Sequence, residues 1–258
     1  MDTDLIQRSP ILEYDPAPTA IIEPRGPTLS EATPECAVLC FFQDVLKQLL
    51  EAGQLVPIGR LGSEMGDNPV YRMDYAGQRL LVAHPGVGAA LAAAFLDELI
   101  ASGVKKFIAC GGCGVLNREI AVGHPVVLTA AVRDEGTSYH YLPPAREAQP
   151  SPAAVFALEQ ACRQAGLPYL LGKAWTTDAF YRETTARRAR REAEGCVVVE
   201  MEAAAFFAVA EFRKVTFGQV VYGGDLVVPE GWDPRSWQAR GDDRARIFWL
   251  AADAANLL

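Results

Sequence analysis

Short apolar runs, each about as long as a buried strand, alternate with helical patterns along most of the chain. The runs predict strands over 36–42, 70–75, 79–84, 106–110, 125–132, 169–175, 197–201 and 216–222. Apolar residues at helical spacing predict helices over 43–53, 89–102, 152–166, 203–212 and 245–258, and the basic run "TTARRARREAEG" predicts one over 184–195. Strands that alternate with helices in this way favour one mixed or parallel sheet with helices on both faces. The sequence therefore predicts the α/β class.

The first part of the chain differs from the rest. Residues 1–34 are rich in proline and acidic residues, which is typical of an extended arm. The 258 residues fit one large α/β domain or two small ones, and we expect one domain over 35–258. The N-terminus has no basic segment followed by an apolar one, and no uncharged apolar run reaches ~18 residues. We therefore expect neither a secretory signal nor a membrane partner.

The net charge of −8 and the isoelectric point near 5.0 describe an acidic surface. Such a surface repels phosphate backbones, so nucleic acid is not expected as a partner. The six cysteines have no disulfide spacing, and the three histidines have no metal-ligand spacing. The sequence therefore predicts a cytoplasmic protein in a reducing compartment, with no metal and no other cofactor.

Unusual residues follow several of the predicted strands. They are Gly86 and Gly88, the stretch "CGGCG" at 110–114, whose last four residues predict a turn, Phe180 and Tyr181, the acidic pair in "EME" at 200–202, and "GGD" at 223–225. Ligands of open α/β sheets bind beyond the carboxyl ends of the strands. The shared placement of these residues therefore predicts a ligand site at that edge of the sheet.

Glu200 and Glu202 are the clearest candidates for ligand binding. A buried unpaired carboxylate costs several kcal/mol, so acids between a buried strand and a buried helix need partners. Carboxylate oxygens form strong hydrogen bonds with vicinal hydroxyls of a ligand, and Met201 between them offers an apolar surface. In the alternative interpretation, one glutamate caps the following helix, where its charge suits the helix dipole. Both interpretations hold if each glutamate takes one role.

The aromatic and aspartate motifs also allow two interpretations each. Phe180 and Tyr181 either stack on a flat ring or pack beneath a loop. Asp225 is either a general acid, whose pKa a glycine-lined pocket would raise, or an ordinary turn residue.

The glycine and cysteine motifs are weaker. Gly86 and Gly88 either let an anion approach a helix N-terminus or form a tight turn. Cys110 and Cys113 are better explained as small buried side chains than as a zinc or redox pair.

Together these stretches resemble the nucleoside phosphorylase family, which contains purine nucleoside phosphorylases, uridine phosphorylases and methylthioadenosine nucleosidases. The resemblance covers residues 36–258 and is carried by "HPGVGAALAAAFLDELI", "GGCGVL", "AVRDEGTSYHYLPP", "TTDAFY", "VEMEAAAFF" and "GGD". It implies a single three-layer α/β/α domain around a mixed, twisted sheet. It also implies a homodimer, or a hexamer built as a trimer of dimers, with sites near the subunit interfaces.

The resemblance also implies roles for individual residues. Glu202 would accept hydrogen bonds from the 2′- and 3′-hydroxyls of a ribose, with Met201 against the sugar and Glu200 alongside. Phe180 would stack on the base, and Gly112 belongs to the loop around the substrate. Asp225 would donate a proton or a hydrogen bond to N7 of a purine, supported by Arg240. An acid at the base and a carboxylate near the sugar would stabilise both charges that develop as the bond breaks.

Several phosphate-binding residues of the family are replaced. Ala109 stands where phosphorolytic members carry an arginine, and Gly112 stands where they carry a hydroxyl residue. The first strand leads into "FFQDVLK" rather than into a Gly-Asp-Pro turn with an arginine. Without guanidinium groups a bidentate phosphate clamp is hard to build. The candidates to rebuild an anion site are Arg60, Arg72 and Arg133, with Gly86 and Gly88 as backbone donors.

The base-reading residues differ as well. Thr184 and Ala186 replace the glutamine and arginine with which uridine phosphorylases read uracil. Uracil is therefore not expected as the base.

The family pattern predicts a pentosyltransferase of purine salvage that cleaves a purine-type nucleoside by phosphorolysis. The products would be free base and ribose 1-phosphate, with inorganic phosphate as co-substrate. One alternative is a nucleosidase that uses water, with Glu64 or Glu135 as the base. The other is a nucleoside-binding protein with little catalysis.

Overall fold

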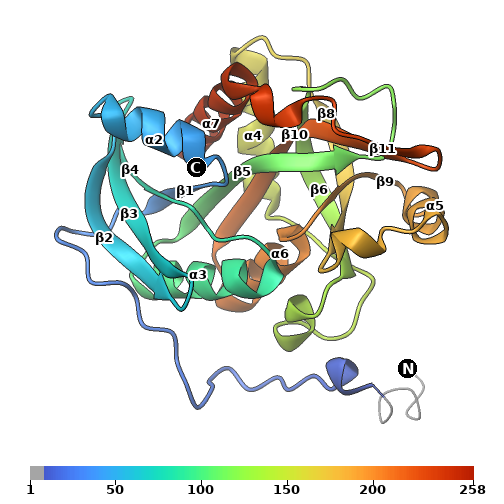
Figure 1. Ribbon diagram of the computed structural model, residues 1–258. Helices are drawn as coiled ribbons and strands as arrows, with labels where there is room; N and C mark the ends of the chain where they lie inside the picture. Colours follow the sequence, from blue (N-terminus) through green and yellow to red (C-terminus); the bar gives the residue numbers. More distant parts are fainter. Residues whose placement is uncertain (1–8) are drawn as a thin grey trace.

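The computed structural model describes residues 9–258, and its central feature is a mixed sheet with strands from most of the chain (Figure 1). The strands are β1 Cys36–Cys40, β2 Val56–Ser63, β3 Gly66–Tyr75, β4 Gln78–Ala83, β5 Lys106–Val115, β6 Pro125–Asp134, β7 Glu147–Ala148, β8 Leu170–Thr177, β9 Cys196–Glu200, β10 Thr216–Val228 and β11 Gly231–Asp233. Their order is β11-β10-β6-β8-β9-β5-β1-β4-β3-β2, with β7 beside β6.

Part of the sheet closes on itself. Strand β10 pairs with β6 on one side and with β5 on the other, so β5, β9, β8, β6 and β10 form a ring. The pairs β1–β4, β1–β5, β5–β10, β6–β8 and β8–β9 are parallel. The carboxyl ends of β1, β5 and β10 therefore point the same way, and so do those of β6, β8 and β9.

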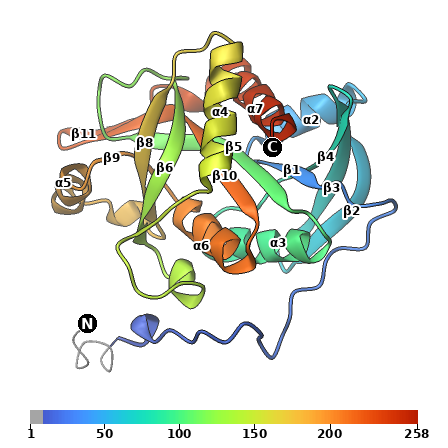
Figure 2. The same cartoon turned by 180° about the vertical axis from the view of Figure 1, so that it is seen from behind.

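Helices cover both faces of the sheet, which confirms the predicted three-layer α/β/α fold (Figures 1 and 2). Helices α3 Ala89–Ala101 and α6 Ala203–Arg213 lie on one face. Helices α2 Gln43–Glu51, α4 Pro152–Gln164 and α7 Gly241–Asn256 lie on the other. Helix α5 Thr185–Ala193 lies beside β9, and the short 3-10 helices η1 Pro10–Leu12, η2 Thr137–His140, η3 Phe180–Arg182 and η4 Trp237–Ala239 occur in connections.

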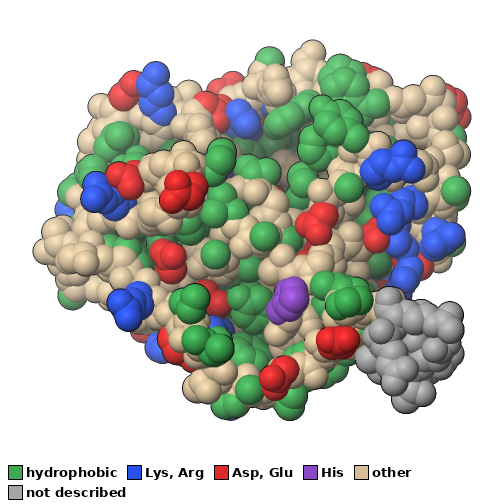
Figure 3. Space-filling view, turned by 60° about the horizontal axis from the view of Figure 1, so that its bottom comes forward, with side chains coloured by type: hydrophobic (Ala, Val, Ile, Leu, Met, Phe, Trp, Pro, Cys, Tyr) green, Lys and Arg blue, Asp and Glu red, His purple; other side chains and the backbone are tan. Residues whose placement is uncertain are grey.

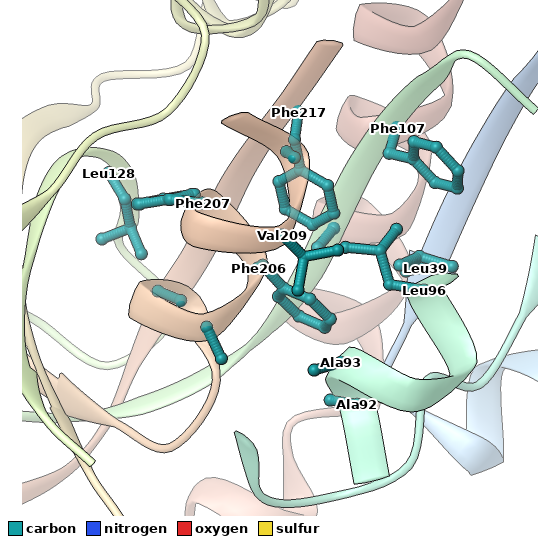
Figure 4. Close-up of a cluster of buried hydrophobic side chains, with 14 of the residues drawn as sticks. Leu39, Ala92, Ala93, Leu96, Phe107, Leu128, Phe206, Phe207, Val209 and Phe217 are labelled. Atoms are coloured by element: carbon teal, nitrogen blue, oxygen red, sulfur yellow. The ribbon is translucent and has the colours of Figure 1, made fainter. Parts of the chain in front are cut away.

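The core on the α3/α6 face explains why these two helices are apolar on nearly every side. Phe206 stacks on Phe217 of β10 with ring centroids 4.8 Å apart, and Leu96 and Val209 pack nearby (Figure 4). Alanines such as Ala92 let the two helices approach closely. Truncating Phe206 to alanine would leave a cavity and cost about 3–5 kcal/mol.

The predicted turn "GGCG" is wrong, because its glycines lie inside a strand, and "GGD" does not end the last strand as predicted. Strand β5 continues through "CGGCG" to Val115, and β10 continues through "GGD" to Val228. A Cβ on Gly114 would lie 2.9 Å from Val199 Cγ1, and one on Gly223 would lie 2.9 Å from the Ala121 carbonyl oxygen. These glycines are therefore needed for close packing rather than for chain reversal.

Three strands, β2, β7 and β11, were not predicted. Strand β2 contains Pro57, Gly59 and Gly62, and proline and glycine are disfavoured in strands, so the sequence gives no clear strand pattern there. In the structure, the register of the β2–β3 pair shifts between Pro57 and Gly59.

The N-terminal segment runs across the surface beneath β2 and α3 (Figure 1). Apart from η1, residues 9–35 contain no helix or strand. The Ser30 N–H donates to the Ile58 carbonyl at 2.7 Å, and the Glu35 carbonyl accepts from Lys105 N–H at 2.9 Å. Residues 1–8 of the predicted arm lie outside the described residues, and the division at residue 35 stays a prediction. No helix in the described part of the chain has the length and apolar character to cross a bilayer.

Candidate functional site

A cavity of about 890 Å³ lies at the carboxyl ends of β1, β8 and β9 and against β5 and β10. Its size suits a small molecule. Six aromatic side chains, four acids and one arginine are among its lining residues. In the surface view, hydrophobic side chains gather around a hollow (Figure 3).

The sequence-predicted residues that line this cavity come from four parts of the chain. They are Gly112 of β5, Phe180 of η3, Glu200 at the end of β9 with Met201 and Glu202 directly after it, and Asp225 of β10. The parallel pairing of β8 with β9, which places Thr176 opposite Glu200, brings the Phe180 and glutamate segments together.

Glu200 is a structural acid as well as a cavity residue. Its Oε2 accepts from the backbone N–H groups of Glu202 at 2.8 Å and Ala203 at 2.7 Å. Its Oε1 accepts from the Thr176 hydroxyl. Burial raises the pKa of Glu200, and these three hydrogen bonds oppose the rise. Glu200 therefore holds the first turn of α6, as one of the two sequence interpretations requires.

Glu202 lines the cavity, and a backbone N–H group outside the cavity holds its carboxyl group in place. Its Oε1 accepts from the Gly88 N–H at 2.6 Å, which joins the start of α3 to the start of α6. The side chain is 7% exposed. Burial raises the pKa of Glu202, and the neighbouring Glu200 charge raises it further. The carboxyl group therefore favours ligands that donate hydrogen bonds and disfavours anions.

Asp225 lies in the same cavity, where Trp232 holds it. The indole Nε1–H of Trp232, from the β10–β11 hairpin, donates to Asp225 Oδ2 at 2.7 Å. Arg235 donates to the Gly224 carbonyl from Nε at 2.9 Å and from Nη2 at 2.6 Å. These contacts fix both the side chain of Asp225 and the strand that carries it.

Glu183 is a fourth cavity acid that sequence reasoning missed. It follows η3 directly, and its N–H donates to the Phe180 carbonyl at 3.2 Å. Burial, assisted by the charge of Asp225, raises the pKa of Glu183 to about 7. The sequence signal that could have identified Glu183 is its position three residues after Phe180, the candidate aromatic for stacking on a base.

Two aromatic rings lie at the mouth of the cavity. Phe180 is 50% exposed, and its ring centroid is 4.2 Å from that of Tyr181. An exposed ring beside a cavity offers a free face to a flat ligand.

Three other predicted site residues do not line the cavity. Gly86 and Gly88 flank Val87, which does line it, and their positive φ angles of 81° and 87° require glycine. The Gly88 N–H is already used by Glu202. Arg240 is exposed and pairs with Asp243 at 3.2 Å, while Arg235 lies against the Asp225 strand.

The arginines proposed to rebuild an anion site also lie elsewhere. Arg60 pairs with Asp67 at 3.1 Å, and Arg72 lies 3.4 Å from Glu31. Arg133 is buried and donates to the Ser138 hydroxyl and to two backbone carbonyls.

The acids proposed as the base for water do not line the cavity either. Glu64 is exposed in the β2–β3 turn. Glu135 is buried, and its Oε2 accepts from the Ser138 N–H at 2.9 Å.

The cation that does line the cavity is Arg244 of α7, which sequence reasoning missed. Its guanidinium pairs with Asp44 at 2.8 Å and lies over the Phe42 ring, 5.0 Å from the centroid. Its charge is therefore largely engaged by the protein itself.

Gln219 of β10 adds a neutral polar group to the cavity lining. It is 1% exposed, and its Oε1 has no hydrogen-bond partner among residues 9–258. A buried amide oxygen without a partner costs about 1–3 kcal/mol unless a donor reaches it. A water molecule or a ligand hydroxyl would supply that donor.

Within the described residues, no three His, Cys, Asp or Glu side chains lie together as a metal site would require. All six cysteines are buried free thiols.

The fold and the acid-lined cavity define an α/β protein with room for a small polar ligand. The family model described as "Phosphorylase superfamily" matches residues 35–246, and the chain belongs to this superfamily. The family resemblance seen in the motifs is thereby confirmed.

The chain is similar to proteins of several named activities. It is 32% identical over 159 residues to guanosine phosphorylase from Halorubrum lacusprofundi, covering 61% of this chain and 66% of that protein. It is 30% identical over 151 residues to uridine phosphorylase from Treponema pallidum, covering 54% of this chain and 58% of that protein. The matched stretches thus span less than two thirds of both relatives. AMP nucleosidase from Bacteroides thetaiotaomicron has a similar structure, with a TM-score of 0.69, 25% identity, and coverage of 86% of this chain and 87% of that chain.

Proposed function

We propose that this protein cleaves the N-glycosidic bond of a purine-type nucleoside. The observation that supports this most is that Glu202, Phe180 and Asp225 line one cavity, although they come from separate elements. A nucleoside offers hydroxyls to the Glu202 carboxyl group, a flat ring to the Phe180 ring and a ring nitrogen to the Asp225 carboxyl group. The names of two similar proteins, guanosine phosphorylase and AMP nucleosidase, support a purine.

At the sugar end, Glu202 accepts hydrogen bonds from the 2′- and 3′-hydroxyls, and Met201 lies against the ring. The Gly88 N–H and the buried setting keep the carboxyl group oriented before the ligand arrives. As positive charge develops on the sugar, the nearby carboxyl groups of Glu200 and Glu202 stabilise it.

At the base end, Phe180 stacks on the purine, while Asp225 and Glu183 face its nitrogens. Breaking the bond leaves an electron pair on the base, and a proton or hydrogen bond from a carboxyl group stabilises it. The acid at the base therefore acts mainly in the transition state.

We infer that water attacks the sugar, because the cavity lining disfavours phosphate. Four carboxyl groups line the cavity, and Arg244 is already paired with Asp44. A phosphate anion is repelled by each of these groups that is ionised, and a group that takes up a proton offers no positive charge in return. The free amide oxygen of Gln219 accepts a hydrogen bond from a water molecule and offers no donor to a phosphate oxygen.

Phosphorolysis, as predicted from the sequence, stays the rival reaction. It requires cationic groups from outside this cavity, such as those of a second subunit. The homodimer or hexamer also stays a prediction.

The deciding experiment is a panel of nucleosides incubated with and without inorganic phosphate and assayed for free base and for ribose or ribose 1-phosphate. We expect free base and ribose at a rate that phosphate does not change. Ribose 1-phosphate, with turnover only when phosphate is present, would establish phosphorolysis instead.

Binding without turnover is the remaining alternative, and melting temperatures measured on the same panel test it. A ligand at 100 times its Kd stabilises the folded protein by about 2.7 kcal/mol. Stabilisation without release of free base would show a binding protein and would refute the proposed activity.

A further inference from the structure

Glu183 lies in the cavity without a role that the family motifs supply. It follows η3 and is carried on the same short segment as Phe180. A base stacked on Phe180 would therefore lie close to the Glu183 carboxyl group. Both Glu183 and Asp225 line the base end, so the cavity presents two carboxyl groups to the leaving base.

The two acids differ in how the protein holds them. Asp225 Oδ2 already accepts the indole N–H of Trp232 at 2.7 Å. The Glu183 carboxyl group makes no hydrogen bond or ion pair with the described residues, although its backbone N–H is fixed by Phe180. A carboxyl group that is positioned by its backbone and free at its oxygens is able to release a proton to a ligand.

We propose that Glu183 is the catalytic acid that protonates the departing base, and that Asp225 is the neighbour that keeps this proton in place. The proposal rests on the proposed function. It assigns to Glu183 the role that the family resemblance gives to Asp225.

The C1′–N bond breaks, and its electron pair goes to the base while the Glu183 carboxylic acid transfers its proton to a ring nitrogen. Water adds to C1′ and loses one proton. That proton, or one from solvent, returns to the Glu183 carboxylate and completes the cycle.

The electrostatic surroundings support this assignment. Burial first, and then the charge of Asp225, raise the pKa of Glu183 to about 7, so a large fraction of the group holds a proton near neutral pH. The other titratable or charged groups that line the cavity are Cys113 of β5, Glu200 and Glu202 at the start of α6, Tyr181 of η3, and Arg244 of α7. Arg188 of the adjacent α5 is engaged by Glu192 and by the Leu116 and Val227 carbonyls.

The test compares two substrates in wild type and Glu183→Gln. One is the best purine nucleoside of the panel, and the other is p-nitrophenyl β-D-ribofuranoside, whose leaving anion needs no proton. We expect Glu183→Gln to lower kcat on the purine nucleoside by about 10²–10⁴-fold and to change p-nitrophenyl riboside cleavage by less than about threefold. Activity on the second substrate also shows that the variant is folded. The exposed Glu119, outside the cavity, provides the matched control Glu119→Gln.

The pH profile supplies a second readout. Because Glu183 must be protonated to act, wild-type kcat/KM on the purine nucleoside should fall as pH rises through about 7. Glu183→Gln should abolish this fall. Asp225→Asn should move it to lower pH, because the charge that raises the pKa of Glu183 is gone.

Three results would overturn the proposal. Near-normal purine cleavage by Glu183→Gln would show that the acid is another group. Equal losses on both substrates would show a merely structural role. An unmoved profile in Asp225→Asn would remove Asp225 from the mechanism. Wild-type protein that cleaves neither substrate would overturn the proposed function itself.

Discussion

The most informative single change is Glu202→Gln, because function and stability should respond in opposite directions. The substitution keeps the shape of the side chain, and the amide oxygen still accepts the Gly88 N–H. Hydrogen bonds donated by the ribose hydroxyls would favour the ionised form of Glu202 against its raised pKa, and the substitution removes the charge that these bonds would use. It also removes a carboxyl group that burial and Glu200 make costly to ionise.

The expected loss of function follows from the hydrogen bonds to the sugar. A hydrogen bond to a charged group contributes about 1.5–3 kcal/mol, against about 0.5–1.5 kcal/mol for a neutral one. Over two hydroxyls the difference is about 2–3 kcal/mol, or about 30- to 150-fold in kcat/KM.

The expected gain in stability depends on pH. The pKa of Glu202 is raised in the folded state, so its contribution to stability is fully present below its ordinary pKa and is lost as pH rises through the folded value. Gln does not titrate. The two proteins should therefore melt together near pH 5, and the variant should melt higher near pH 9. Each pKa unit corresponds to about 1.4 kcal/mol, or about 3–5 °C for a chain of this size.

Thermal melts at the two pH values and steady-state kinetics measure both effects. Glu200→Gln is the matched control. Its carboxyl group accepts three internal hydrogen bonds, so its replacement should destabilise the protein at pH 5, where Glu202→Gln has no effect. A Glu202→Gln variant that melts lower than wild type at pH 9, or that keeps full kcat/KM, would refute the reasoning.

Three further predictions concern the base end of the cavity. Phe180→Ala should raise KM by about 5- to 30-fold through lost stacking, with no change in melting temperature because the ring is half exposed; an unchanged KM would place the base elsewhere. Arg235→Ala should lower the free energy of unfolding in urea by about 2–3 kcal/mol and should also lower kcat. The reason is that the carbonyls of Gly224 and Ile120 lose their hydrogen-bond donor. The control Arg240→Ala, at an exposed site, should change neither quantity. Wild-type stability should fall as pH rises from 5 through about 7, because the pKa of Glu183 is raised in the folded protein. After allowance for the partial exposure of Glu183, the free energy of unfolding should change by about 1–2 kcal/mol. In Glu183→Gln the melting temperature should fall less steeply with pH.

Local chemistry predicted that the two acids on either side of Met201, which are buried, need partners. In the structure, the Glu200 carboxyl group accepts hydrogen bonds at the start of α6. The Glu202 carboxyl group accepts from Gly88 and lines the cavity. That division was one of the interpretations the sequence allowed. The alternation of strands and helices likewise predicted the layers, because burial on both faces leaves apolar strands and amphipathic or apolar helices.

The missed residues depend on contacts between distant parts of the chain. Glu183, Gln219 and Arg244 carry no motif, and they meet only because β10 passes the end of β9 and α7 returns beside Phe42. The glycine runs were misread for the same reason. Gly114 and Gly223 look like turn residues until the side chains and backbone packed against them are known.

The bond from Gly88 to Glu202 joins segments that are 114 residues apart in the chain. A nascent polypeptide emerging from the ribosome cannot complete it until residue 202 has been made. Ligand capture should therefore begin abruptly once that residue has emerged, rather than grow with length. Two separately expressed fragments divided near residue 103 would each carry one partner of this hydrogen bond, and affinity for a nucleoside would report their reassembly.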